Sequence, residues 1–202
     1  MVAHAKPPYI SPDEYCEREL TAAYKSEYLD GRIVAMAGAQ PDHNMLAFEL
    51  TVILGAQMRD GNSHGFGSDQ LVRVEALNRY YYPDLTVACG PPEFEERPGL
   101  RALKNPTLVA EVLSPATERT DRVDKFDAYR TIPTLTTYLL ISQESERIEC
   151  FTRQPDGSWR VEIAVGRQAT LRLESIRCNL PLGELYARLC FGDDPQPSPV
   201  GS

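Results

Sequence analysis

Hydrophobic residues recur at helical spacing in two segments of the chain. From His43 to Arg59 they return every three or four residues, with Asp42 as the expected N-cap and Gly61 just beyond the end. The run Ser11-Pro12-Asp13-Glu14 offers a capping serine, a proline for the first turn and a glutamate three residues after the cap. This combination predicts a helix that ends near Leu20. Two shorter helices are predicted over residues 121–130 and 181–189.

Extended segments are predicted where β-branched and aromatic residues gather between turn residues. Glu27 to Val34 is predicted to form a β-hairpin, because Asp30-Gly31 suits a two-residue turn with positive φ. Thr107 to Leu113 is short and almost wholly apolar, so it is predicted as a central strand buried on both faces. Residues 61–65 and the proline-containing segment 91–106 are predicted as loops. The other strands are predicted near residues 69–76, 80–89, 136–142, 146–152 and 158–165.

This order of elements predicts a mixed α/β fold, in which helices flank a central mixed β-sheet. We expect a single domain over residues 1–190 and a disordered tail over 191–202, where proline, glycine and serine are frequent. No apolar run reaches the roughly 18 residues needed to cross a bilayer, and the start of the chain lacks the pattern of a secretory signal. The five cysteines form no C-x-x-C pair, which favours a reducing, cytoplasmic compartment.

Glu111 is a residue that an apolar core does not explain. It lies between Ala110 and Val112 in the predicted central strand, where an ionised carboxylate is costly to desolvate without cations or hydrogen-bond donors. Asp84 follows Pro83 at a predicted strand start, 27 residues earlier. Adjacent strands would bring both carboxylates to one divalent cation, because such cations prefer hard oxygen ligands. The alternatives are a structural ion pair for Glu111 and an ordinary turn for Pro83-Asp84.

Two motifs resemble a known nuclease group. Pro83-Asp84 followed by Glu111-Val112 resembles the signature of the PD-(D/E)XK nuclease superfamily. The longer run from Glu111 to Thr117 resembles the Uma-two family, a bacterial family described as restriction endonucleases. Further matches to that family are Asp121-Arg122, Lys125, Tyr129, Glu27, Gly31 and His43. The resemblance covers roughly residues 9–190 and implies a restriction-endonuclease-like fold, with Mg²⁺ or Mn²⁺ as cofactor and DNA as substrate.

The chain departs from the superfamily signature at one position. Two residues after Glu111, where the signature has lysine, stands Leu113. The resemblance implies that Lys125, on the following helix, takes over this role. Asp121, Lys125 and Tyr129 share one arc of that helix, so the lysine could reach the sheet and orient water or stabilise phosphate charge. The alternative is a solvated lysine paired with Asp121 at i−4.

Three more residues are candidates for the site. Glu27 would be a third acidic ligand if its side of the hairpin faces the core, and an ordinary surface glutamate otherwise. His43 lies near a predicted helix start, where a phosphate could be held, although surface histidines are also common there. Arg122 adds positive charge close to Lys125, but neighbouring aspartates balance it and a solvated helix face is the alternative.

The leading hypothesis is a metal-dependent endonuclease that hydrolyses DNA phosphodiester bonds. Its expected metal ligands are Asp84, Glu111 and Glu27, its catalytic residues are Asp84, Glu111 and Lys125, and its substrate contacts are His43 and Arg122. The net charge of −8 argues against tight nonspecific DNA binding, because phosphate contacts favour basic surfaces.

Other functions stay open. The charge, Leu113 and an altered strand at 138–143 would also fit a nuclease-fold binding or assembly module without catalysis. A phosphodiesterase on RNA or nucleotides is a further alternative, because the same site chemistry would serve it. Exposed sheet edges make a homodimer the expected assembly.

Overall fold

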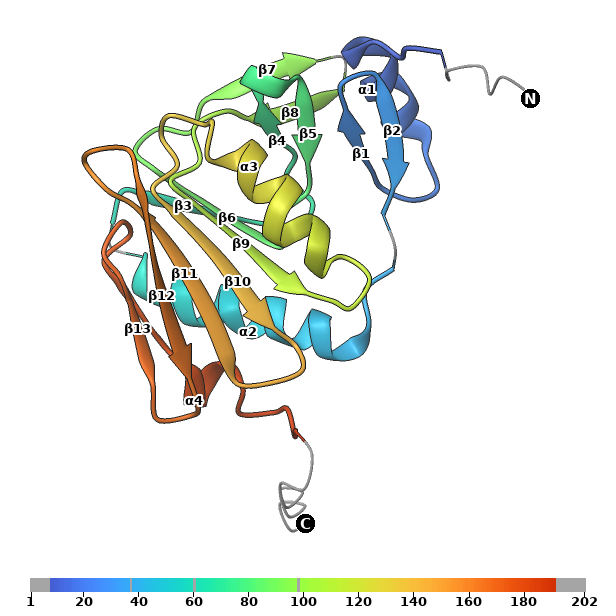
Figure 1. Cartoon of the computed structure of the whole chain (residues 1–202). Coiled ribbons are helices and arrows are strands. Elements are labelled where there is room, and N and C mark those ends of the chain that lie inside the picture. The colour runs from blue at the N-terminus through green and yellow to red at the C-terminus, as the bar shows by residue number, and fades with distance from the viewer. Residues whose placement is uncertain (1–7, 37, 60, 98, 192–202) are drawn as a thin grey trace, which may run out of the picture.

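Two six-stranded sheets form the framework of the protein (Figure 1). The structure is a computed structural model, and it describes residues 8–36, 38–59, 61–97 and 99–191. The first sheet has the order β2-β1-β5-β4-β8-β7. Its strands are β1 (Ser26–Leu29), β2 (Arg32–Ala35), β4 (Val72–Val74), β5 (Arg79–Tyr81), β7 (Phe94–Arg97) and β8 (Leu100–Leu103). A 3₁₀ turn, Glu75–Leu77, separates β4 from β5.

The second sheet is the central one and has the order β12-β11-β10-β9-β6-β3. Its strands are β3 (Ser63–Gly67), β6 (Leu85–Cys89), β9 (Leu108–Leu113), β10 (Thr137–Ser142), β11 (Arg147–Arg153) and β12 (Trp159–Val165). β9 and β10 run parallel, whereas the other neighbouring strands are antiparallel. The predicted mixed α/β fold with a central mixed sheet is therefore confirmed.

Helix α2 (Pro41–Gln57) covers one face of the central sheet, as the helical spacing of its apolar residues predicts (Figure 1). Leu46, Leu50 and Leu54 are fully buried and belong to the same core cluster as Leu108 and Ala110 of β9. A two-stranded ribbon and a short helix complete this layer: β13 (Thr170–Leu173), β14 (Cys178–Pro181) and α4 (Leu182–Leu185). This face holds the larger hydrophobic core.

The opposite face of the central sheet carries a short helical segment. It begins as a π-helical turn, Thr120–Lys125, and continues as α3 (Phe126–Tyr129). Tyr129 packs on Tyr138 of β10 with ring centroids 5.6 Å apart, and on Tyr81 of β5 at 5.2 Å. The segment therefore joins the central sheet to the first sheet, and both sheets meet beside it.

Several local predictions are confirmed in detail. Ser11 caps α1 (Pro12–Thr21), since its Oγ accepts a hydrogen bond from the Glu14 backbone N–H at 3.2 Å. Asp30 and Gly31 turn the β1–β2 hairpin with φ of 43° and 92°. All six residues of β9 are buried, so the apolar run does form a strand covered on both faces.

Two predicted loops are strands. Residues 63–65 of the predicted loop 61–65 belong to β3, which pairs with β6, although glycines at 65 and 67 weaken the strand pattern. The proline-containing segment contains the β7–β8 hairpin. Prolines 91, 92 and 106 lie outside those strands and so do not interrupt their hydrogen bonding.

Other boundaries also differ from the prediction. The strand expected over 80–89 is split into β5 and β6, because Pro83 cannot donate a ladder hydrogen bond. Helix α2 begins at Pro41 after Gln40, so Asp42 lies in its first turn and is not the cap. The β13–β14 ribbon was not predicted, and the last helix is shorter than expected.

The expected tail is mostly outside the described residues, which end at Phe191. That phenylalanine packs on Tyr186 with ring centroids 5.7 Å apart. Among the helices of the described ranges, none has the length and apolar character to span a bilayer.

Truncation of a buried α2 residue tests the packing of this helix on the sheet. Leu50 is fully buried, so Leu50→Ala should lower the free energy of unfolding by about 2–5 kcal/mol through lost contacts and a residual cavity. The matched control, Val52→Ala, changes a side chain that is 47% exposed on the same helix and should stay within about 0.5 kcal/mol. Urea denaturation measures both. Equal losses in the two variants would contradict the packing described here.

Candidate functional site

Glu111 lies in the middle of β9 on the face of the central sheet that α3 covers. Its neighbours on that side of the strand, Val109 and Leu113, belong to the cluster that contains Tyr129. The residue is only 3% exposed. Its Oε1 accepts a hydrogen bond from the Tyr129 hydroxyl at 3.2 Å and lies 3.2 Å from Lys125 Nζ. The carboxylate that the sequence placed in an apolar strand is therefore compensated by a cation and a donor.

Asp84 stands next to Glu111 because of the register between β6 and β9. Leu85 pairs with Ala110 in this antiparallel ladder, so the next position sets Asp84 across from Glu111. The Val112 backbone N–H donates a hydrogen bond of 2.7 Å to Asp84 Oδ2. His43 Nε2 lies 3.2 Å from Asp84 Oδ1, which places the start of α2 against this carboxylate. Both oxygens of Asp84 are thus fixed in position.

Lys125 is the cation around which the other acids gather. Its Nζ lies 3.1 Å from Glu27 Oε1, 3.2 Å from Glu111 Oε1 and 3.0 Å from Asp121 Oδ1. Glu27 comes from β1 of the first sheet, whereas Asp121 comes from the same π-helical turn as the lysine. The lysine is 6% exposed, so the solvated-lysine alternative is wrong, although its predicted pairing with Asp121 is present.

We call Glu27, Asp84, Glu111, Asp121 and Lys125 the acidic cluster. If its four carboxyl groups were all ionised, their negative charge would exceed what the single ammonium balances, and burial makes that imbalance more costly. Residues from three parts of the fold meet here: the hairpin of the first sheet, the neighbouring β6 and β9 region of the central sheet, and the π-helical turn. The cluster therefore depends on the junction between the two sheets.

Burial raises the pKa of Glu111 well above its ordinary value, and the neighbouring carboxylates add to the rise while Lys125 opposes it. The pKa values of Asp84 and Glu27 are also raised by burial, against the opposing effects of His43 on the first and Lys125 on the second. Burial alone would lower the pKa of Lys125, but the carboxylates of Glu111, Glu27 and Asp121 hold it well above its ordinary value. The lysine is therefore charged, whereas Glu111, Asp84 and Glu27 bind protons more readily than ordinary carboxylates do.

The donor set of the cluster suits a hard divalent cation. Mg²⁺ binds carboxylate oxygens, commonly through one or two protein carboxylates with water and phosphate in its other positions. Two buried oxygens, Glu27 Oε1 and Asp121 Oδ1, lie 3.1 Å and 3.0 Å from Lys125 Nζ, which is the cation that compensates them. In the described part of the chain, no three His, Cys, Asp or Glu side chains are arranged to hold a metal ion together. The carboxylate chemistry and the excess of acids over cations therefore fit a divalent cation.

The remaining predicted site residues occupy different surroundings. His43 contacts Asp84, as described above, so it borders the acidic cluster. Arg122 pairs with two acids outside the cluster: its Nε lies 2.7 Å from Glu118 Oε1 and its Nη1 lies 2.8 Å from Glu149 Oε2 of β11. The sequence motifs included Asp121 as a family match and as an ion-pair partner of the lysine, but Asp121 was not predicted as a site residue. The signal for it was present, because Asp121 shares the helical arc of Lys125.

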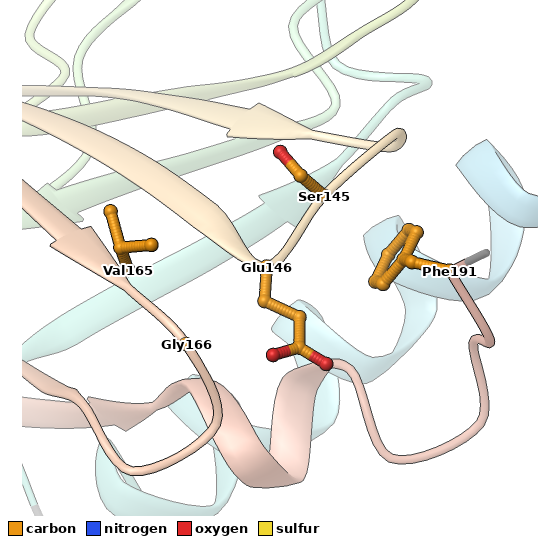
Figure 2. Close-up of a pocket in the computed structure, with 5 residues that line it drawn as sticks. All are labelled: Ser145, Glu146, Val165, Gly166 and Phe191. Atoms are coloured by element: carbon orange, nitrogen blue, oxygen red, sulfur yellow. The ribbon is translucent and has the colours of Figure 1, made fainter. Parts of the chain in front are cut away.

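A surface pocket of about 240 Å³ lies elsewhere, at the ends of β11 and β12 (Figure 2). Its lining residues are Ser145, Glu146, Val165, Gly166 and Phe191. The one charged side chain among them, Glu146, is engaged by Arg167 Nε at 2.5 Å. No member of the acidic cluster borders this pocket. We therefore place the candidate site at the cluster, where titratable groups converge.

The chain is similar to known proteins over most of its length. It matches the Uma2 family, described as “Putative restriction endonuclease”, over residues 12–182. Two uncharacterized proteins of Synechocystis sp. are each 34% identical to it. The alignments cover 88% and 95% of this chain, and 99% and 100% of those proteins.

A solved structure supports the same fold. It is a crystal structure from Anabaena variabilis titled “a putative nuclease belonging to DUF820”, with a TM-score of 0.67 and 17% identity. The superposition covers 82% of this chain and 92% of that one. At this identity the similarity concerns the fold, which agrees with the nuclease-like architecture expected from the motifs. Because the family match extends over most of the sequence, the chain belongs to the Uma2 family.

Proposed function

We propose that this protein is a Mg²⁺- or Mn²⁺-dependent endonuclease that hydrolyses DNA phosphodiester bonds at the acidic cluster. The observation that carries the proposal is the placement of Asp84 opposite Glu111, in a buried cluster with more carboxylates than cations. Such an excess is costly for folding alone, because each carboxylate loses its hydration. It is useful where a divalent cation must be attracted and held.

The proposed ligands are Asp84 and Glu111, with Glu27 completing the acidic set. A bound divalent cation would supply Lewis-acid activation of water and neutralise charge on the phosphate. The Val112 N–H and His43 orient the Asp84 carboxylate before any ligand arrives, which reduces the cost of ordering it. Tyr129 plays the same part for Glu111, because its hydroxyl donates to Oε1.

Lys125 is proposed as the group that stabilises negative charge during hydrolysis. The support for this role is its distance from the strand acid, since Nζ lies 3.2 Å from Glu111 Oε1, whereas the position two residues after that glutamate holds Leu113. Its raised pKa keeps the ammonium charged, so it acts as an electrostatic and hydrogen-bonding group and not as a base.

His43 and Arg122 are proposed to contact substrate, His43 at the border of the cluster and Arg122 from its ion pairs outside it. His43 is partly exposed beside Asp84, where an imidazole can donate to a phosphate oxygen. Arg122 is shared between Glu118 and Glu149, so contact with a phosphate would exchange those ion pairs for a new one.

A second candidate function is a nuclease-fold binding or assembly module without catalysis. The observation that favours it is the position of Lys125, whose ammonium contacts three carboxylates and partly neutralises the cluster by itself. In that case the cluster would be a structural ion network that fixes the helical turn to both sheets. Activity and metal binding distinguish the two functions.

Plasmid nicking tests the catalytic proposal directly. Wild-type protein with Mg²⁺ or Mn²⁺ should convert supercoiled DNA to the nicked form. Asp84→Asn and Glu111→Gln should each reduce the rate by about two orders of magnitude or more, because each removes a charge that positions the cation. Asp124→Asn is the matched control, since Asp124 is an exposed acid on the π-helical turn that carries Asp121 and Lys125. Cleavage that survives both cluster variants would exclude this mechanism.

Metal binding can be measured without DNA. Thermal melting of the wild-type protein should shift upward with added Mg²⁺ or Mn²⁺, by an amount equivalent to about 2.7 kcal/mol when the free metal is about 100 times its Kd. The double variant Asp84→Asn/Glu111→Gln should show no such shift, while Asp124→Asn should behave as wild type. An unshifted wild-type melting curve would favour the non-catalytic module.

The pH dependence of stability tests the electrostatics of Glu111. Its pKa in the folded protein is raised above the ordinary 4.5, so the native state binds this proton more tightly than the unfolded chain. The resulting stability is fully present below pH 4.5 and is lost as the pH rises through the raised pKa. Glu111→Gln should therefore show a smaller loss of unfolding free energy across this window. Urea denaturation of metal-free protein from about pH 5 to 8 provides the measurement. Parallel curves would contradict the assignment.

A further inference from the structure

Among the strands of the described residues, β12 is the longest at an open sheet edge. It has seven residues and ends the order of the central sheet, whereas the other edge strands β2, β3 and β7 have four, five and four (Figure 1). The neighbouring β13 pairs with β14 and not with β12. Native proteins usually shorten, cover or pair such an edge, because its free backbone groups can bind another strand.

The free backbone groups of β12 belong to its odd-numbered residues. Two hydrogen bonds at the ends of the β11–β12 ladder show this alternation. Gln154 N donates to Ser158 O at 2.8 Å, and Gly166 N donates to Glu146 O at 2.8 Å, so Ser158 and Gly166 both belong to hydrogen-bonded pairs with β11. Even-numbered positions on this strand therefore face β11, and odd-numbered positions direct N–H and C=O outward. The outward residues within β12 are Trp159, Val161, Ile163 and Val165.

The side chains of β12 also alternate, between the two faces of the sheet. Val161, Ile163 and Val165 are 48%, 48% and 63% exposed and project from one face of the sheet. Arg160 and Glu162 project from the other face, and their side chains are 63% and 52% exposed. The edge is thus open on both faces, apolar on one and of mixed charge on the other.

We propose that β12 pairs antiparallel with β12 of a second copy of this chain, about a two-fold axis at Val161. An axis perpendicular to the sheet keeps each side chain on its own face, so only residues of equal parity can be opposite one another. With the axis at Val161, Arg160 of each copy is opposite Glu162 of the other, and Trp159 is opposite Ile163.

Charge complementarity selects this register over its neighbours. An axis at Arg160 sets the two arginines opposite each other, and an axis at Glu162 does the same for the two glutamates. Like charges at directly opposed positions are destabilising. An axis at Ile163 places Glu162 opposite Ala164 and forms no charge pair. The strand is therefore self-complementary about one residue.

The same register satisfies the free backbone groups. Val161 would pair with itself through its outward N–H and C=O, and Trp159 with Ile163 in the same way. Arg160 and Glu162 then occupy non-hydrogen-bonded pairs, in which opposed side chains approach most closely. The two central sheets would join into one continuous twelve-stranded sheet. Backbone geometry and charge thus support the same partner, independently of the proposed nuclease activity.

Charge exchange between the two positions tests the register. In sedimentation runs that extend up to about 100 μM protein, the wild type should reach the mass of a dimer, about twice the 22.6 kDa of one chain. Arg160→Glu and Glu162→Arg should each be monomeric, because each sets like charges opposite one another. An equimolar mixture of these two variants should regain the dimer mass, since the exchanged charges are again complementary. The double variant Arg160→Glu/Glu162→Arg should also dimerise.

The controls separate this interface from other surfaces. Arg172→Glu changes an exposed arginine of β13 that pairs with Glu174 at 2.8 Å, and it should leave the dimer unchanged. Circular dichroism should show native folding in all variants, because the altered side chains are exposed. A monomeric wild type, single variants that still dimerise, or a mixture that stays monomeric would each overturn the proposal.

Discussion

The buried ammonium of Lys125 is the interaction on which the arrangement of the site depends. It lies within 3.2 Å of carboxylate oxygens from the first sheet, the central sheet and its own helical turn. Removing one partner from such a buried network leaves uncompensated charge, which costs about 3–5 kcal/mol. The lysine therefore links three elements by charge where the aromatic contacts of Tyr81, Tyr129 and Tyr138 link them by packing.

This network also bears on the catalytic role proposed for Lys125. A β-strand fixes the direction of each side chain, so a lysine two residues after Glu111 would lie on the same face of β9. Leu113 holds that position and joins the apolar cluster. The π-helical turn supplies the ammonium from above the sheet instead. π-Helical turns are rare and frequently occur at functional sites, which agrees with this role.

The open edge of the central sheet is a separate constraint. Glu111, Leu140, Glu149 and Ile163 lie in one row across β9, β10, β11 and β12. The acidic cluster is thus three strands away from the proposed dimer edge. A substitution at the edge can therefore change assembly without touching the cluster, and the two sets of residues can be studied independently.

The sequence by itself determined the local elements and the identity of the main acids. Periodicity, the Ser11 cap and the Asp30-Gly31 turn depend on nearby residues, so they predicted helices and the first hairpin correctly. Glu111 was recognisable because its own strand is apolar. Tertiary structure alone decided that Val112 N–H and His43 hold Asp84, and that Glu27 reaches Lys125 from another sheet. Those contacts join residues distant in the chain, and strand register and sheet packing, which no local pattern encodes, bring them together.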